Sequence, residues 1–80
     1  MYFVYILKSI KDHKYYIGST SDIHARLNYH NSGRRRSTRH RIPFELAYQE
    51  EYSDRKQAEK REREIKSYKG GEAFKRLLMV

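Results

Sequence analysis

The 80-residue chain contains no cysteine and no tryptophan, and its only proline is Pro43. Without cysteine, neither disulfide bridges nor thiolate-bound metal sites are available. Its first apolar stretch, residues 2–7, is far shorter than the ~20 residues that a membrane-spanning helix needs. A lysine and an aspartate follow that stretch without a small-residue cleavage site, which argues against a secretory signal peptide. We therefore expect a cytoplasmic protein with no membrane association.

Positive charge dominates what the chain does contain. Eighteen Lys plus Arg residues stand against ten Asp plus Glu, which gives a formal net charge of +8. Such an excess raises the local concentration of polyanions and speeds their association. Nucleic acid is the expected partner, with an anionic membrane surface, an acidic protein or a merely basic, ribosome-like role as alternatives.

Apolar and turn patterns predict the order strand, strand, helix, strand, helix, helix. Residues 2–7 and 14–19 are aromatic and β-branched, and the polar turn between them is typical of a hairpin. Residues 44–52 alternate apolar and polar side chains, so Phe44, Leu46 and Tyr48 are expected on one buried face. The pattern indicates one domain of the α/β (α+β) class.

Capping signals place the three helices. The first helix is expected to begin after Ser21 or Asp22 and to end at the Asn31–Gly33 stop. The second covers roughly residues 54–68, and the last covers residues 72–79 beyond a glycine pair. Residues 34–41, between the first helix and the third strand, lack apolar periodicity and are predicted to form a basic surface loop.

Two polar side chains of the first helix lie where apolar ones are expected. Arg26 and His30 fall within roughly 100° of Ile23 and Leu27, the stripe that should face the sheet. Solvated arginines normally lie on the opposite side. Arg26 therefore either serves a site or extends its guanidinium past the edge of the core.

Glu62 is the corresponding anomaly of the second helix. It lies in the middle of the apolar stripe formed by Ala58, Ile65 and Tyr68. A carboxylate on that stripe is costly unless it meets a cation or a metal ion. Helical spacing alone leaves two interpretations open: a functional ligand, or a structural ion pair with an arginine such as Arg26 or Arg61.

In order and spacing, these residues resemble the GIY-YIG nuclease domain, over nearly the whole chain from residue 2 to residue 78. Val4-Tyr5-Ile6 and Tyr16-Ile17-Gly18 are similar to the two halves of the signature, with ten residues between the tyrosines. Residues 25–31 resemble the family's arginine helix, and residues 62–66 resemble its glutamate helix. Phe3-Val4 replaces the leading Gly-Ile. The likeness is to small stand-alone bacterial members and to the N-terminal nuclease of the excision-repair subunit UvrC.

The resemblance implies a three-stranded antiparallel sheet flanked by three helices, and a metal-dependent DNA endonuclease linked to repair or recombination and directed by DNA structure. It assigns Glu62 to one divalent ion, Mg²⁺ or in its place Mn²⁺. Arg26 would hold a phosphate oxygen. Nearby cations would favour the phenolate of Tyr5, which would accept a proton from water. Tyr16 would assist through a hydrogen bond, and His30 would orient Tyr5 or share its proton.

Other residues complete the expectation. Gly18 should leave room for the backbone near the site. The loop arginines would contact phosphates without reading bases; they are Arg34, Arg35, Arg36, Arg39 and Arg41. Tyr2, Tyr15 and Tyr48 are expected only to pack. DNA is the expected substrate, RNA is left open, and a protein partner would supply specificity. The competing hypotheses are a non-catalytic nucleic-acid-binding domain and a partner-dependent subunit.

Overall fold

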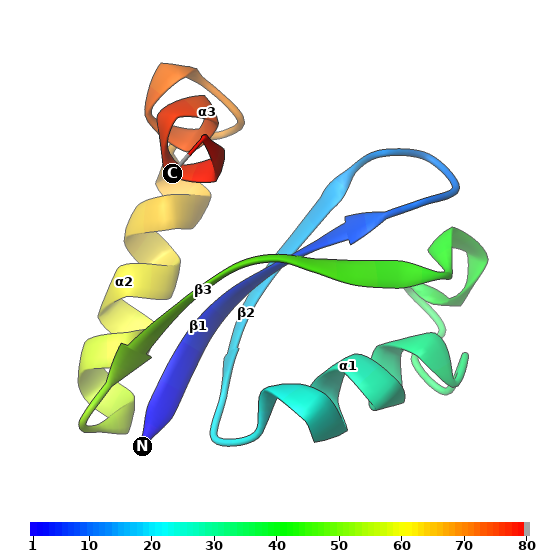
Figure 1. Cartoon of the computed structure of the whole chain (residues 1–80), viewed down its shortest axis with the longest axis horizontal. Helices are drawn as coiled ribbons and strands as arrows, with labels where there is room; N and C mark the ends of the chain where they lie inside the picture. The colour runs from blue at the N-terminus through cyan, green and yellow to red at the C-terminus, as the bar shows by residue number, and fades with distance from the viewer. Residues whose placement is uncertain (80) are drawn as a thin grey trace.

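The structure, a computed structural model, describes residues 1–79 (Figure 1). It confirms the predicted order of strands and helices, and a short 3₁₀ turn at Arg39–Arg41 interrupts the predicted loop. The elements are β1 (Tyr2–Ser9), β2 (Tyr15–Thr20), α1 (Ile23–Asn31), β3 (Phe44–Tyr52), α2 (Arg55–Ser67) and α3 (Glu72–Leu78). Within the described range, no helix combines the length and hydrophobicity needed to cross a bilayer.

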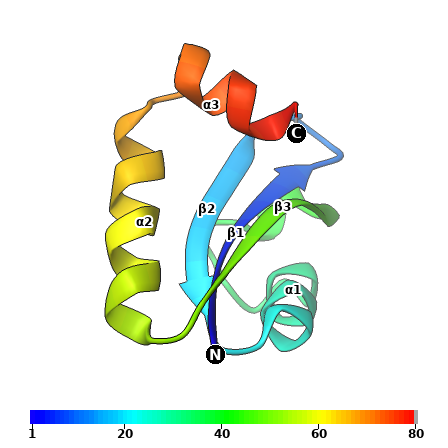
Figure 2. The ribbon, with the colours of Figure 1, turned by 60° about the vertical axis from the view of Figure 1, so that its left-hand side comes forward.

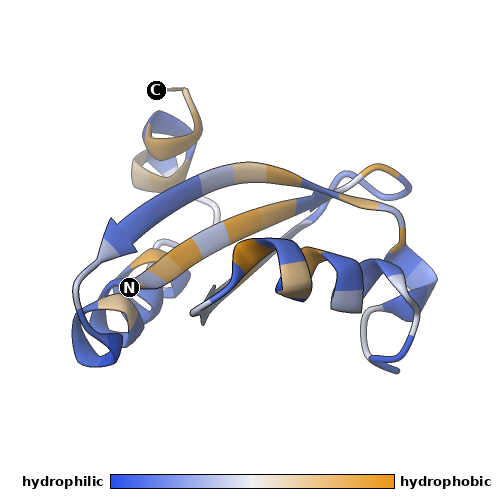
Figure 3. Ribbon diagram, turned by 60° about the horizontal axis from the view of Figure 1, so that its bottom comes forward, coloured by the Kyte–Doolittle hydropathy of each residue, from blue (hydrophilic) through white to orange (hydrophobic). Residues whose placement is uncertain are grey.

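The three strands form an antiparallel sheet in the order β2-β1-β3. Helix α2 covers one face of the sheet and α1 the other, with α3 beyond the end of α2 (Figures 1 and 2). Because the central strand is covered on both sides, it has a continuous buried run, Val4–Leu7, instead of an alternating one. Figure 3 shows the same contrast, with hydrophobic residues concentrated in β1 and mostly hydrophilic residues in α2.

Each face of the sheet has its own apolar cluster. Val4 and Ile6 pack with Ala58, Ile65 and Phe74 on the α2 face. Tyr5 and Leu7 pack with Phe44 on the α1 face. Of the tyrosines expected only to pack, Tyr2 and Tyr48 border the α2 cluster, and the ring of Tyr15 meets the ring of Phe74 edge-on, with centroids 5.2 Å apart. Tyr48 does more than pack, because its hydroxyl also donates a hydrogen bond to Glu50.

One expectation about β3 was wrong. Phe44 and Tyr48 do not share a face, since Phe44 belongs to the α1 cluster and Tyr48 borders the α2 cluster. Ile6 pairs with Tyr48 and Leu7 with Leu46, so Ala47 is an extra residue, and the pairing shifts at that point. Such a bulge reverses the alternation for the rest of the strand, and the sequence pattern carries no sign of it.

The helix starts agree with the capping signals. The side chain of Asp22 accepts a hydrogen bond from the backbone amide of Ala25 at 3.0 Å, and Asp54 does the same for Gln57 at 2.9 Å. These caps satisfy amides that the first helical turn leaves unpaired. They fix the start of α1 and of α2, and therefore which residues of each helix face the sheet.

Candidate active site

Tyr5 is the centre of the predicted site. It lies on β1 with its side chain on the α1 face, and the residue is only 3% exposed. Its hydroxyl oxygen lies 3.4 Å from Nε2 of His30, a residue of the last turn of α1. The two halves of the tyrosine signature meet here as well, since the rings of Tyr5 and Tyr16 stack with centroids 6.4 Å apart.

His30 is enclosed by aromatic rings. It is completely buried, and its ring centroid lies 4.7 Å from that of Tyr16, 5.7 Å from that of Tyr29 and 5.9 Å from that of Phe44. Burial, assisted by Arg35 and Arg26, lowers the pKa of His30 from its ordinary 6.5 to about 4. The imidazole is therefore neutral at physiological pH, and one ring nitrogen is free to accept a hydrogen bond.

A residue absent from the prediction holds this end of α1 in place. The Asn31 side chain donates to the backbone oxygen of Phe44 at 3.0 Å and accepts from its backbone amide at 2.7 Å. The amide side chain thus ties the last residue of α1 to the first residue of β3. His30 precedes Asn31, so this pair of hydrogen bonds also fixes the position of the imidazole.

The expectation that cations favour the Tyr5 phenolate is not met by the protein alone. Burial, together with the neighbouring Tyr16, raises the pKa of the Tyr5 phenol above its ordinary value of 10.0. Arg26 and Arg35 oppose this rise but do not overcome it. Burial wins because a phenolate enclosed by the sheet and α1 loses its hydration. Without bound cations, the hydroxyl therefore keeps its proton.

Arg26 lies on the predicted side of α1 and is half-buried. Its guanidinium carbon lies 5.6 Å from the centre of the Tyr29 ring. Within residues 1–79 it forms no ion pair with a carboxylate. It lines a hollow between the β2–α1 turn and α1. An arginine held there without a counter-ion suits a bound anion.

Glu62 is on α2, across the sheet from α1, and it lies beside the edge strand β2. One carboxylate oxygen accepts a hydrogen bond from the Ser19 hydroxyl at 2.7 Å, and the other lies 2.7 Å from the ammonium of Lys66. Ser19 directly follows Gly18, which pairs with Tyr5 in the register of the sheet. The carboxylate is near enough to Tyr5 that its charge raises the pKa of the phenol.

The structural alternative for Glu62, an ion pair with Arg61 or Arg26, does not form. Arg61 instead binds Glu50 of β3 through both a 2.9 Å and a 3.1 Å hydrogen bond. Glu50 also accepts hydrogen bonds from the hydroxyls of Tyr48 and Tyr52. This network attaches α2 to β3. Glu62, which is 19% exposed, is left with the hydroxyl of Ser19 and the exposed ammonium of Lys66 as its partners among residues 1–79.

Gly18 leaves room for the side chain of Tyr5. A Cβ placed on Gly18 would lie 2.5 Å from the hydroxyl oxygen of Tyr5 and 2.7 Å from the ring carbon that bears it. Real Cβ atoms do not approach other atoms so closely. The missing side chain therefore lets the Tyr5 ring cross β2 toward the strand edge.

The five loop arginines do not form one group. Arg34, Arg36 and Arg39 are exposed and make no ion pair within residues 1–79, as expected of non-specific phosphate contacts. Arg41 binds Asp12 at 3.1 Å and its side chain is 16% exposed, so its expected role at the surface is replaced by a structural one. Arg35 is half-buried, with its guanidinium carbon 5.3 Å from the centre of the Tyr16 ring.

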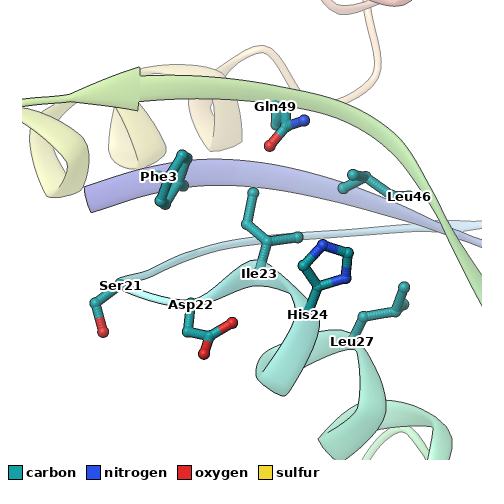
Figure 4. Close-up of a pocket in the computed structure, with 8 residues that line it drawn as sticks. All are labelled: Phe3, Ser21, Asp22, Ile23, His24, Leu27, Leu46 and Gln49. Atoms are coloured by element: carbon teal, nitrogen blue, oxygen red, sulfur yellow. The ribbon is translucent and has the colours of Figure 1, made fainter. Parts of the chain in front are cut away.

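A larger hollow of about 470 Å³ lies elsewhere on the α1 face (Figure 4). Phe3, Ile23, Leu27 and Leu46 line most of it, and the polar Asp22 and Gln49 lie at its border. None of the predicted catalytic residues line it. Its lining is mainly apolar and lacks the residues of the tyrosine signature, so size alone does not identify the functional site here.

The oxygen atoms of Glu62 and Ser19 suit a metal ion that takes few ligands from the protein. Among residues 1–79, no three His, Cys, Asp or Glu side chains are grouped as a complete metal site would require. Glu62 offers one carboxylate, with the hydroxyl of Ser19 beside it. Such a set does not fit structural zinc, which takes four protein ligands. It does fit Mg²⁺, which keeps several waters and is commonly held by one or two carboxylates plus substrate phosphates.

Comparison with known proteins identifies the family of the chain. The family model described as "GIY-YIG catalytic domain" matches residues 1–74, and the chain belongs to this family, whose fold is that of a nuclease. Its relatives within the family are small stand-alone proteins called UPF0213.

A UPF0213 protein of Staphylococcus epidermidis is 46% identical over 68 residues, which cover 84% of this chain and 82% of that protein. A Staphylococcus aureus relative is 44% identical over the same shares. The solution NMR structure of a UPF0213 protein from Bacillus halodurans is 36% identical, with 84% of this chain and 72% of that chain covered and a TM-score of 0.49.

Proposed function

We propose that this protein is a metal-dependent endonuclease that hydrolyses phosphodiester bonds in DNA. The observation that carries the proposal is the cluster around the buried Tyr5 hydroxyl: His30 Nε2 lies 3.4 Å from it, the Tyr16 ring stacks on the Tyr5 ring, and Arg35 lies over Tyr16. Charges from α1, the following loop and α2 also influence the pKa of this hydroxyl. A purely structural tyrosine has no need of this convergence.

The proposed reaction begins with a water next to the Tyr5 hydroxyl. His30 is neutral and its Nε2 lies 3.4 Å from that hydroxyl, so it can accept a hydrogen bond from the phenol and orient it toward the water. Arg26 and Arg35 lower the pKa of the phenol; once the phenol has released its proton to solvent, the phenolate oxygen takes a proton from the water. The hydroxide attacks phosphorus, and the bond from phosphorus to the departing oxygen breaks. Arg26 binds a non-bridging oxygen, where negative charge develops.

Glu62 is the proposed ligand of the divalent ion, Mg²⁺ or Mn²⁺. Ser19 donates to one of its oxygens, and this hydrogen bond orients the carboxylate. The ammonium of Lys66, whose side chain is 53% exposed, is free to leave the other oxygen. When bound, the ion would neutralise charge on the phosphate and on the departing oxygen.

The proposed substrate is DNA whose shape, rather than base sequence, selects the cut. Arg34, Arg36 and Arg39 are positioned for backbone contacts, which carry no base information. A role in repair or recombination, and a protein partner that chooses the substrate, are part of the same proposal. RNA should be tested beside DNA, because its backbone offers the same phosphate groups to these arginines.

The test is a cleavage assay on branched, nicked and single-stranded DNA with Mg²⁺ or Mn²⁺. Arg26→Ala is compared with Arg63→Ala, an exposed arginine on α2. Metal-dependent cleavage by the wild type and by Arg63→Ala, with loss in Arg26→Ala, supports the proposal. Cleavage that is equal in all three proteins, or absent from all, contradicts it. In the second case, salt-sensitive DNA binding would indicate a non-catalytic binding domain.

A further inference from the structure

The half-buried arginines divide into two pairs. Each member of the first pair has a carboxylate partner: Arg41 binds Asp12 at 3.1 Å and Arg61 binds Glu50 at 2.9 Å. Each member of the second pair, Arg26 and Arg35, has none within residues 1–79. Holding a cation partly out of water without a counter-ion is unfavourable. The second pair is therefore available to bind an anion from outside the protein.

Arg26 and Arg35 lie at the two ends of one row of aromatic rings. The guanidinium of Arg26 lies over Tyr29, whose ring is 5.7 Å from His30. The His30 ring is 4.7 Å from Tyr16, and the guanidinium of Arg35 lies over Tyr16. Both arginines also lower the pKa of the buried His30, so both are close to the reacting groups.

Arg35 is held in this position by its own loop. Its Nε donates to the hydroxyl of Ser37 at 3.1 Å, and its backbone oxygen accepts from the amide of Arg39 at 2.9 Å. Its two terminal nitrogens have no hydrogen-bond partner in the described part of the chain. The fork of the guanidinium is thus oriented in advance and free to bind.

We propose that Arg35 is a second phosphate-binding residue of the active site, which grips the same phosphodiester segment as Arg26 from the other end of the aromatic row. The ligand is a phosphodiester, whose two non-bridging oxygens match the guanidinium fork. This inference rests on the proposed nuclease function and deepens it, because it separates Arg35 from the loop arginines on either side.

The neighbours of Arg35 provide matched controls in single-turnover and steady-state cleavage. Arg34 and Arg36 are exposed and belong to the same loop. Arg35→Ala is expected to lower kcat roughly 100-fold, as loss of one transition-state donor does. Arg34→Ala and Arg36→Ala are expected to raise KM a few-fold at unchanged kcat. Arg35→Lys should recover only part of kcat, since it keeps the charge and loses the fork. Equal effects of all three alanine variants would overturn the proposal.

A second measurement does not depend on cleavage. The arginine Nε–Hε NMR signals of the wild-type protein are followed during titration with the dinucleotide TpT, which has one phosphodiester, in the absence of divalent ions. The signals of Arg26 and Arg35 are expected to shift together, and those of Arg34 and Arg36 much less. A shift of Arg26 without Arg35 overturns the inference. Joint shifts in a protein that cleaves nothing would reject the nuclease function and leave only the shared binding of a phosphodiester by Arg26 and Arg35.

Discussion

The ring of Tyr5 crosses the backbone of Gly18 so closely that a Cβ there would lie 2.5 Å from the phenolic oxygen. Tyr5 belongs to the first half of the tyrosine signature and Gly18 to the second, and the two residues are paired in the sheet. The absent side chain on the second strand makes room for the functional group of the first. The glycine and the tyrosine therefore act as one unit.

Replacing Gly18 by alanine should displace the Tyr5 ring. Tyr5 is enclosed by the sheet and α1, so the added methyl group cannot be accommodated without movement in the core. We expect Gly18→Ala to lower the free energy of unfolding by about 1–3 kcal/mol, the usual cost of overpacking, and to abolish most of the activity. Chemical denaturation and the cleavage assay measure the two effects.

A double-mutant cycle shows whether the loss comes from this contact. In a Tyr5→Leu background the methyl group meets a smaller side chain, so Gly18→Ala should cost less there than in the wild type. If the cost is the same in both backgrounds, the clash with Tyr5 is not its cause.

Acid should destabilise the protein through His30. The pKa of this imidazole falls from 6.5 to about 4 on folding. Between those values the unfolded state binds a proton that the folded state does not, so stability decreases as the pH falls from about 6.5 to about 4. The contribution reaches about 3 kcal/mol, at 1.36 kcal/mol per pKa unit. Urea unfolding at a series of pH values measures it.

Variants of two histidines on α1 distinguish the contribution of His30 from the general loss of stability in acid. His30→Gln should reduce the decline between pH 6.5 and pH 4, whereas His24→Gln, at an exposed position of the same helix, should leave it unchanged. Glu50, whose pKa is lowered because hydrogen bonds from Arg61 and the tyrosines outweigh its burial, adds a further acid-sensitive contribution to all three proteins. Identical profiles for His30→Gln and the wild type would show that His30 is not held neutral.

Ser19 should act through Glu62. Its hydroxyl donates to the carboxylate at 2.7 Å, so Ser19→Ala leaves that carboxylate less well oriented. The Mn²⁺ concentration for half-maximal cleavage should increase about 10-fold, in the range typical of lost outer ligands. Calorimetric titration of Mn²⁺ should give the same change. The control is Ser21→Ala, at a nearby exposed position. Equal metal affinity in the two variants would show that Ser19 does not orient Glu62.

Periodicity and capping signals were enough to predict most of the fold and the faces of the helices. Asp22 and Asp54 cap as expected, and this fixes Arg26 and His30 toward the sheet and Glu62 on the inner side of α2. A charged group on an apolar stripe drew attention to Arg26 and Glu62 because burial makes such a group costly. The bulge at Ala47 was missed because an inserted residue leaves the alternation of letters intact while it reverses the faces.

The electrostatics of the site depend on tertiary packing and could not be read along the chain. Arg35 lies in a loop without periodicity, so no pattern distinguishes it from Arg34, and only its position over Tyr16 does. The effect of burial on Tyr5 was missed for the same reason. The resemblance implied that Arg26, a metal ion and other cations would favour the phenolate, whereas in the protein alone the packing of α1 over the ring makes burial the larger effect on the pKa of Tyr5.

The most direct test of the central claim compares two carboxylates of α2. Glu62 faces the β2 edge beside Ser19, and Glu59 pairs with Arg55 on the outer side of the helix. In single-turnover cleavage across a Mg²⁺ titration, Glu59→Gln should behave as the wild type does. Glu62→Gln should cleave roughly 10²–10³-fold more slowly, as enzymes do on losing one electrostatic contact to the transition state. Metal-dependent cleavage by Glu62→Gln at the wild-type rate would contradict the account.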